Sequence, residues 1–321
     1  MNPLNIFQKS FLYTTICALT CLTLPLFSQG ASDTSGENPT VDIEDVSQVN
    51  IEGGQSQSPF YISAKVDSIR KTDIEKGYYK HDSVEFAEAD VEGGMVFYYC
   101  PAYQEGANVA LRYTTTLLRW ESNPWFSQEH FHTLTFTLGG FSHRVDRWFW
   151  KAQAAVNVDA NEWDFNQYAW YDFLLWGRYD YCRSIGLHIG IIAQTGMKMD
   201  RVIPILGADW QMSRNWKLNL VFPVNVSIEY MLTKNWSLAL AGRSFDSRHR
   251  AKKSEGKALL RYQNVGAEFA VKYEEHSMSA NIHAGTTLGG DIRIANKENH
   301  HPHHYKLKPS PYVGAEATVH F

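Results

Sequence analysis

Histidines crowd one short segment of the chain, which contains His300, His301, His303 and His304 with Pro302 between them. Imidazoles at this density can bind Zn²⁺, Cu²⁺ or Ni²⁺. The segment falls in a stretch that we expect to form a polar external loop, where solvated histidines account for the same residues. We adopt that second interpretation and predict no metal site and no cofactor.

Signatures of common enzyme classes are absent from the sequence. It contains no Gly-x-Ser-x-Gly elbow, no phosphate-binding glycine-rich loop and no His-Glu-x-x-His pair. We therefore predict that the protein is not an enzyme. The formal net charge is -4 and no basic block occurs, which argues against nucleic acid as a partner.

Charged side chains recur at alternate positions of otherwise apolar segments. A charged group that faces lipid near the membrane midplane costs roughly 2–4 kcal/mol for Arg or Lys, so in a membrane protein these groups must face water or a partner. We predict that they point into the lumen of a barrel and are candidates for lining a pore. They are Lys65, Asp67, Arg112, Lys151, Asp172, Arg178, Glu229, Arg243, Glu268, Lys272, His283 and Glu316.

The elements that carry these residues have the period-two alternation of β-strands. In one block Val265, Ala267, Phe269, Val271 and Tyr273 alternate with Gly266, Glu268, Ala270 and Lys272. Helical spacing is hard to find, so we predict an all-β chain. Fourteen strands are expected, near 59–70, 91–103, 108–120, 131–142, 148–158, 167–182, 185–196, 202–212, 216–222, 226–232, 236–244, 263–273, 278–288 and 312–321.

The predicted connections sort by parity. Those after even-numbered strands are short turns, and those after odd-numbered strands include all the long ones, at 71–90, 121–130, 245–262 and 289–311. Bacterial outer-membrane barrels have an even strand number, short periplasmic turns and longer external loops. The sequence therefore predicts a transmembrane, antiparallel, up-and-down barrel. Twelve strands are the alternative, because 216–222 and 226–232 are shorter than the roughly 9–11 residues of a spanning strand.

Two Asn-Trp turns support the hairpins. Asn215-Trp216 and Asn235-Trp236 each place Trp at the start of a strand, where amphipathic rings favour a membrane–water interface. Ordinary core packing explains the same aromatic residues. The long external loop at 245–262 carries Arg248, Arg250, Lys252, Lys253 and Lys257, and we expect it to be a solvated charged loop.

The N-terminal segment has the parts of a secretory signal peptide. Lys9 precedes an apolar run from Phe11 to Leu26, and small residues follow at Ser28 and Gly30. We predict a signal peptide at 1–30, a flexible acidic periplasmic leader at 31–58 and the barrel at 59–321. Cys100 and Cys182 lie in the predicted barrel. An exported compartment permits a disulfide between them, and two free thiols are the alternative.

The final strand has one unbroken apolar face, made by Val313, Ala315, Ala317, Val319 and Phe321. A barrel must pair its last strand with its first, because an open edge in lipid leaves backbone groups unsatisfied. These residues resemble the C-terminal signal by which outer-membrane barrels are recognised by their assembly machinery. That resemblance implies the assembly machinery and outer-membrane lipid as partners.

The middle of the chain is also similar to an uncharacterised, porin-like family of outer-membrane barrels, a domain of unknown function. The similarity runs from Asp200–Gly207 through the two Asn-Trp turns and Phe222-Pro223 to Ser247–Arg250. It implies the fold and an outer-membrane location, and it leaves the activity open.

Three functions remain open for such a barrel. The preferred hypothesis is a porin-like channel for small polar solutes, based on the two signs of inward charge and a strand number wide enough for a lumen. A structural or surface-interaction barrel, adhesin-like, whose charges pair and fill the lumen is the alternative. A transporter of apolar solutes is the third, suggested by Trp170, Leu174 and Trp176 on the predicted inward face.

Overall fold

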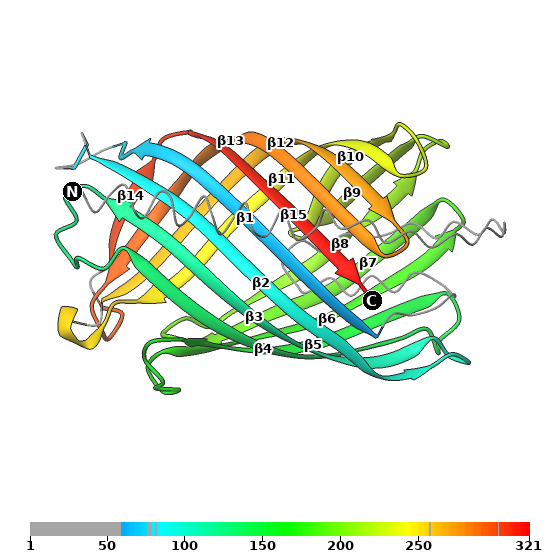
Figure 1. Cartoon of the computed structure of the whole chain (residues 1–321), viewed down its shortest axis with the longest axis horizontal. Helices are drawn as coiled ribbons and strands as arrows, with labels where there is room; N and C mark the ends of the chain where they lie inside the picture. The colour runs from blue at the N-terminus through cyan, green and yellow to red at the C-terminus, as the bar shows by residue number, and fades with distance from the viewer. Residues whose placement is uncertain (1–58, 76–78, 81, 257, 301) are drawn as a thin grey trace. The chain divides into compact units, whose positions relative to one another are not determined.

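The computed structural model (Figure 1) describes residues 59–75, 79–80, 82–256, 258–300 and 302–321. The predicted signal peptide at 1–30 and leader at 31–58 lie outside these residues. In the described part of the chain, no helix has the length and apolar character needed to cross a membrane.

Most of the described chain is antiparallel sheet. The strands are β1 (Phe60–Asp73), β2 (Ser83–Cys100), β3 (Glu105–Trp120), β4 (His130–Ser142), β5 (Trp148–Asp159), β6 (Ala169–Cys182), β7 (Ile185–Gly196), β8 (Arg201–Gln211), β9 (Trp216–Phe222), β10 (Asn225–Met231), β11 (Trp236–Arg250), β12 (Leu259–Glu275), β13 (Met278–Ala295), β14 (His303–Leu307) and β15 (Pro311–His320). One short 3-10 helix, η2 (Lys253–Glu255), lies between β11 and β12.

Fourteen of these strands form a closed ring. Consecutive strands pair from β1 to β13, and β15 pairs with both β13 and β1. The short β14 pairs with the far part of β13, at Gly290–Ile294, and its Leu307 forms an isolated bridge with Ile74. At the seam Tyr61 lies opposite His320, and the backbones of Phe60 and Phe321 exchange two hydrogen bonds of 3.2 and 2.9 Å. The predicted all-β barrel of fourteen strands is confirmed.

The connections sort between the two ends of the barrel as predicted. At the turn end they are 101–104, 143–147, 183–184, 212–215, 232–235 and 276–277. At the loop end the longer ones are 74–82, 121–129, 160–168, 251–258 and 296–302. Trp216 and Trp236 lie at the turn end, half-exposed, with ring centroids 4.9 Å from Tyr230 and Tyr273 respectively.

Several predicted strand boundaries at the loop end were wrong. β2 begins at Ser83, β11 ends at Arg250, β12 begins at Leu259 and β13 ends at Ala295. The predicted loops 71–90, 245–262 and 289–311 are therefore partly sheet. In these segments the apolar side chains point inward. The segments therefore lack the apolar-out, polar-in contrast that marks a lipid-facing strand, and the sequence analysis assigned them to loops.

The outward face of the ring is apolar and open. Large hydrophobic side chains from ten strands are 48–68 % exposed there: Ile62, Leu111, Phe136, Phe173, Ile189, Leu206, Leu240, Phe269, Ile282 and Val313. Water-soluble monomers rarely expose a contiguous apolar surface of this extent. A surface of this kind suits contact with lipid acyl chains.

Candidate functional site in the barrel lumen

The strand register places all twelve predicted lumen residues on the inward face. Each is buried or half-buried. On the opposite face of most of these strands, apolar residues are exposed. Lys65, for example, pairs across the seam with Glu316, both pointing inward. Whether these residues line an open pore stays a prediction.

Deeply buried charges form one network across five neighbouring strands. Arg243 on β11 donates two hydrogen bonds to Glu268 on β12, at 2.7 and 3.1 Å. The Tyr312 hydroxyl donates to the same carboxylate at 3.0 Å. His283 lies 2.7 Å from Asp67, and Arg243 lies 3.9 Å from that carboxylate. Because each of these side chains is at most 4 % exposed, the charges are stabilised by one another rather than by bulk water.

A second network joins β1, β2 and β3. Glu92 accepts a 2.6 Å hydrogen bond from the Tyr61 hydroxyl and a 2.7 Å bond from Arg112 Nε. Glu92 is almost fully buried, whereas Arg112 is about one quarter exposed. The guanidinium therefore keeps one side toward the interior of the barrel.

A group of three charged or polar side chains lies on β6–β8, and one further ion pair joins β10 and β12. On β6–β8, Arg178 donates to Asp209 at 3.0 Å, and His188 contacts the same carboxylate at 2.5 Å. On β10 and β12, Lys272 donates to Glu229 at 2.9 Å. Opposite charges are thus neighbours around the ring, so the lumen has paired charges rather than one acidic and one basic wall.

The sequence analysis missed five residues of these networks: the hydroxyl donors Tyr61 and Tyr312, and the side chains of Glu92, His188 and Asp209. The signal was available for each of them. His188 alternates with exposed Leu187 and Ile189, and the register pairs Asp209 with inward Gly186 and Asn219. Extending the period-two pattern through β7 and β8 would have included them.

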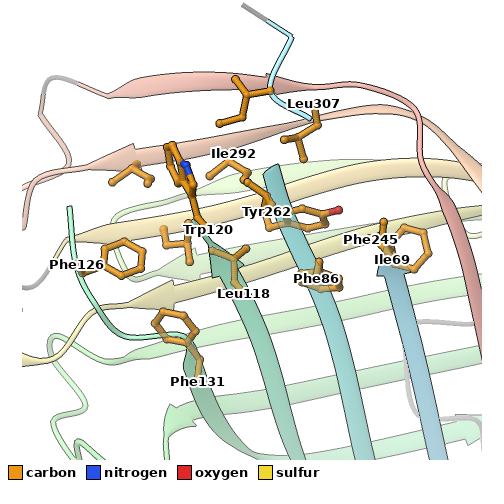
Figure 2. Close-up of a cluster of buried hydrophobic side chains, with 14 of the residues drawn as sticks. Ile69, Phe86, Leu118, Trp120, Phe126, Phe131, Phe245, Tyr262, Ile292 and Leu307 are labelled. Carbon is orange, nitrogen blue, oxygen red and sulfur yellow. The ribbon is translucent and has the colours of Figure 1, made fainter. Parts of the chain in front are cut away.

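The loop end of the lumen is apolar instead. Figure 2 shows inward side chains from opposite parts of the ring packed against each other. Phe86 on β2 stacks on Tyr262 of β12 with ring centroids 4.1 Å apart, and Phe131 on β4 stacks on His249 of β11 at 4.6 Å. We call this set the mouth cluster; its buried members are Ile69, Ile74, Val84, Phe86, Leu118, Trp120, Phe126, Phe131, Phe245, Ala251, Ala258, Leu260, Tyr262, Ile292, Ile294, Leu307 and Tyr312.

The mouth cluster corrects the expectation for the loop at 245–262. Arg248 and Arg250 are not solvated but buried on β11, at 7 % and 3 % exposure. Arg248 donates to the Gly196 carbonyl at 3.1 Å and lies over the Trp170 ring, and Arg250 donates to the Lys297 carbonyl at 3.2 Å. Lys252 and Lys253 are exposed as expected, and Lys257 lies outside the described residues.

The histidine-rich segment does not assemble a binding centre in the described chain. His303 packs on Trp125 at 4.5 Å and His304 lies 2.9 Å from Asp291; His301 is outside the described residues. Across the part of the chain that the structure describes, no group of three or more His, Cys, Asp or Glu side chains is placed to hold a metal ion. Cys100 and Cys182 are free thiols.

The predicted apolar inward residues divide between two small clusters. Leu174 and Trp176 pack with Ile205 and Val221, and Trp170 packs against Met197, Leu259 and Ala295. They fill space beside the charged networks, because Trp176 also donates to His188 at 3.1 Å.

Comparison with known proteins places the chain in a family. It is 22 % identical over 302 residues to an uncharacterized protein of Chlamydia pneumoniae, covering 88 % of this chain and 94 % of that protein. An uncharacterized protein of Chlamydia trachomatis serovar D is 26 % identical over 192 residues, covering 59 % of this chain and 60 % of that protein.

Among solved structures, similar chains include an outer membrane channel from Pseudomonas putida F1, with a TM-score of 0.46, 9 % identity and coverage of 86 % of this chain and 100 % of that chain. A deltaS2S3 mutant of the TodX monoaromatic hydrocarbon channel has a TM-score of 0.40 and 8 % identity, covering 84 % and 91 %. Residues 145–320, more than half of the sequence, match the family described as a domain of unknown function (DUF6268). The chain belongs to that family.

Proposed function

We propose that the protein is an outer-membrane channel of the porin type, which passes small polar solutes along a lumen of mixed charge. One observation carries the proposal: around a closed ring of fourteen strands, exposed apolar side chains alternate with inward charged ones. Only closed barrels and helices satisfy every backbone group in a bilayer. A lumen that contains polar groups of both signs is suited to hydrated, polar solutes.

The paired charges favour solutes with little net charge. Each carboxylate of the central network has a cationic or hydrogen-bonding partner. A strongly charged solute would gain little from an already neutralised wall, whereas sugars, zwitterions and small neutral metabolites can exchange hydrogen bonds with it. The mouth cluster closes one end of this route, so the structure corresponds to a closed channel in the proposed function.

The proposed location follows from the same two faces. The apolar outward face makes outer-membrane lipid the expected surroundings. The apolar side of β15 at Val313, Ala315, Ala317 and Val319, followed by Phe321, is the proposed recognition strand for the barrel-assembly machinery. Replacing Phe321 by Ala should lower the yield of folded barrel in outer membranes without lowering the amount of exported chain.

Planar bilayer recording tests the channel directly. Purified, folded protein should give discrete conductance steps after insertion, and liposomes containing it should take up small polar solutes faster than empty liposomes. The variant Lys65→Gln, with a half-buried lumen charge, should change the step size, whereas Lys308→Gln, with a half-exposed side chain at the rim, should leave it unchanged. Folded protein that stays silent under all voltages, together with liposomes that take up nothing, would reject the channel.

A structural or surface-interaction barrel is the second candidate, and the pairing of lumen charges favours it. In that case the lumen is permanently filled, and partners bind the long connections at the loop end. The liposome assay separates the candidates, because a filled barrel admits neither polar nor apolar probes. Uptake of apolar probes alone would instead support the third possibility, a transporter of apolar solutes along Trp170, Leu174 and Trp176.

A further inference from the structure

The tip of the β11–β12 hairpin has an unusual burial pattern for a barrel wall. We call the described residues 245–256 and 258–262 the mouth hairpin. Wall strands bury one face and expose the other, but four consecutive residues from Ser247 to Arg250 are all at most 7 % exposed. Ser247 and His249 face the mouth cluster, whereas Arg248 and Arg250 face Trp170 and Tyr168. Both faces are covered, so this part of β11 lies inside the barrel rather than in its wall.

Ring geometry supports the same placement. In a ring of fourteen strands, β4 and β11 are seven positions apart in either direction, which is as far apart as two strands can be. With strands about 4.8 Å apart and tilted by about 40°, a circular ring of that size is on the order of 30 Å across. Two wall side chains cannot span that distance, yet Phe131 and His249 stack at 4.6 Å. The mouth hairpin therefore extends across the mouth toward β4.

Because the neighbouring β9–β10 hairpin is short, the far part of β11 can leave the barrel wall. β10 pairs with β11 only from Ser237 to Gly242, so the edge of β11 beyond Gly242 has no strand beside it among the described residues. On its other edge β11 stays paired with β12 up to Arg250 opposite Leu259. The pairing of β12 with β13 has a register irregularity between Asn264 and Gly266, and such bulges bend the strand that contains them. The mouth hairpin thus has a free edge on β11, whereas its β12 edge stays paired with β13 up to Leu259 opposite Ala295.

Besides its mouth-cluster packing and its pairing with β13, the tip of the mouth hairpin is attached to neighbouring loops by a few polar contacts. The Glu255 carboxylate in η2 accepts hydrogen bonds from the Ser127 amide at 2.8 Å, the Ser127 hydroxyl at 2.7 Å and the Gln128 amide at 3.0 Å. The Lys252 amide donates to the Gln128 side chain at 3.0 Å. Ser127 and Gln128 belong to the β3–β4 loop, which Figure 1 shows at the same end of the barrel as η2.

Two contacts attach the tip to the β5–β6 loop as well. Lys253 lies 3.4 Å from Glu162, and the Tyr168 hydroxyl donates to the Ala251 carbonyl at 3.2 Å. The Lys253 pair is exposed and contributes little. Glu255 makes three of the contacts with one carboxylate, and charged acceptors form the stronger hydrogen bonds. Among the contacts between the tip and the neighbouring loops, this carboxylate is therefore the group whose loss should weaken the attachment most.

We propose that the mouth hairpin is a lid over the lumen, latched to the β3–β4 loop by Glu255, and that release of this latch opens the channel. The proposal rests on the proposed channel function for its conductance and on the mouth geometry alone for its movement. The mouth cluster is the closed position of the lid. The lid bends at the irregularity beside Gly266 and carries with it the end of β13, Gly290–Ala295, to which its β12 edge is bonded.

The test compares Glu255→Gln with Glu121→Gln as a matched control. Glu121 lies in the β3–β4 loop that Glu255 binds, but its own ion pair is with Lys71, outside the mouth hairpin. Conductance in planar bilayers gives the open fraction. Movement is measured separately by the reaction of a membrane-impermeant maleimide with a reporter thiol, Ala251→Cys, in a Cys100→Ser/Cys182→Ser background. Ala251 is fully buried at the tip, and Ala258→Cys provides a second reporter.

Loss of the latch should raise both the open fraction and the labelling rate about tenfold, which corresponds to about 1.4 kcal/mol. Ser127→Ala, which removes one of the three bonds, should raise them by about threefold, and Glu121→Gln should change neither. A difference in electrophoretic mobility between unheated and heated samples shows that each variant is a folded barrel.

The two readouts separate failure of the lid from failure of the channel. Faster labelling without conductance in any variant would support the lid and reject the channel. Conductance in the parent protein with labelling and open fraction unchanged in Glu255→Gln and Ser127→Ala would reject the lid and leave the channel standing. An equal increase in Glu121→Gln would also overturn the latch, because a general loosening of the loop would then explain the result.

Discussion

Removal of the Arg243 guanidinium tests the central charge network. In Arg243→Met the long apolar stem is retained, so the change is largely one of charge and hydrogen bonding. Two hydrogen bonds to Glu268 are lost, and Asp67 loses a cation at 3.9 Å. Arg243 is 4 % exposed and Glu268 2 %. Breaking a buried pair by deleting one partner typically costs about 3–5 kcal/mol, because the remaining charge is left uncompensated.

Reversible denaturant unfolding in lipid vesicles gives the free energy of unfolding. We expect Arg243→Met to lower it by about 3–5 kcal/mol, with part of the loss recovered in Arg243→Met/Glu268→Gln, where no carboxylate is left unpaired by the substitution. Arg119→Met is the control, because Arg119 forms part-exposed pairs with Glu85 and Glu129 near the rim and should cost about 1 kcal/mol or less. Equal losses of unfolding free energy for Arg243→Met and Arg119→Met would refute the conclusion that the Arg243 network is shielded from water.

Three further outcomes are expected. Phe86→Ala removes the ring stacked on Tyr262 and should lower the free energy of unfolding by about 3–5 kcal/mol, measured by the same denaturant titration. Ile282→Arg, at a position 68 % exposed on the outward face, should cost about 2–4 kcal/mol in vesicles but much less in detergent that adapts around the charge; equal losses in both would place this face outside the lipid. Burial disfavours the Glu255 carboxylate, but its hydrogen bonds from Ser127 and Gln128 hold the pKa of this group below its ordinary 4.5, and its charged neighbour on the same segment is Lys252. Since a lowered folded-state pKa gives stability that is present above the ordinary value and lost as the pH falls through the lowered one, maleimide labelling of Ala251→Cys, normalised to a free thiol at each pH, should accelerate only below about pH 4.5, and an acceleration between pH 8 and 6 would contradict the assignment.

Much of the ring could be predicted from alternation, because lipid on one side and polar groups on the other impose a strict contrast along each strand. Val265, Phe269 and Val271 face outward, and Glu268 and Lys272 face inward, as their spacing predicts. The short β9 and β10 strands were also placed correctly, since Phe222-Pro223 marks their junction. The partners of the inward charges could not be predicted from the sequence. Asp67 meets His283 across β15, and that meeting depends on the stagger of the closed ring, which a single strand does not encode.

The mouth cluster was missed for a different physical reason. Leu260, Tyr262, Ile292 and Ile294 do alternate, but with Arg261 and Arg293 on the opposite face. A strand with apolar residues inward and charged residues outward does not fit a lipid-facing wall, so the sequence analysis assigned this region to loops. Arg248 and Arg250 were misplaced for the same reason, because a run of basic residues in a barrel is ordinarily a solvated loop.

The seam between β1 and β15 has a consequence for the order in which the strands can follow one another along the chain. Every other pair of neighbours in the ring is joined by a turn or a loop, whereas at this seam Phe60 and Phe321 meet through two backbone hydrogen bonds and stacked rings, without a connecting segment. Linking these two residues by a few flexible ones and cutting the chain at the turn 183–184 would move the break without altering any strand's partners. Refolded in lipid vesicles, such a circular permutant should reach the same barrel, since exposed turns tolerate new termini. In cells its assembly should be less efficient, because the proposed recognition strand β15 is then internal and the chain ends on β6.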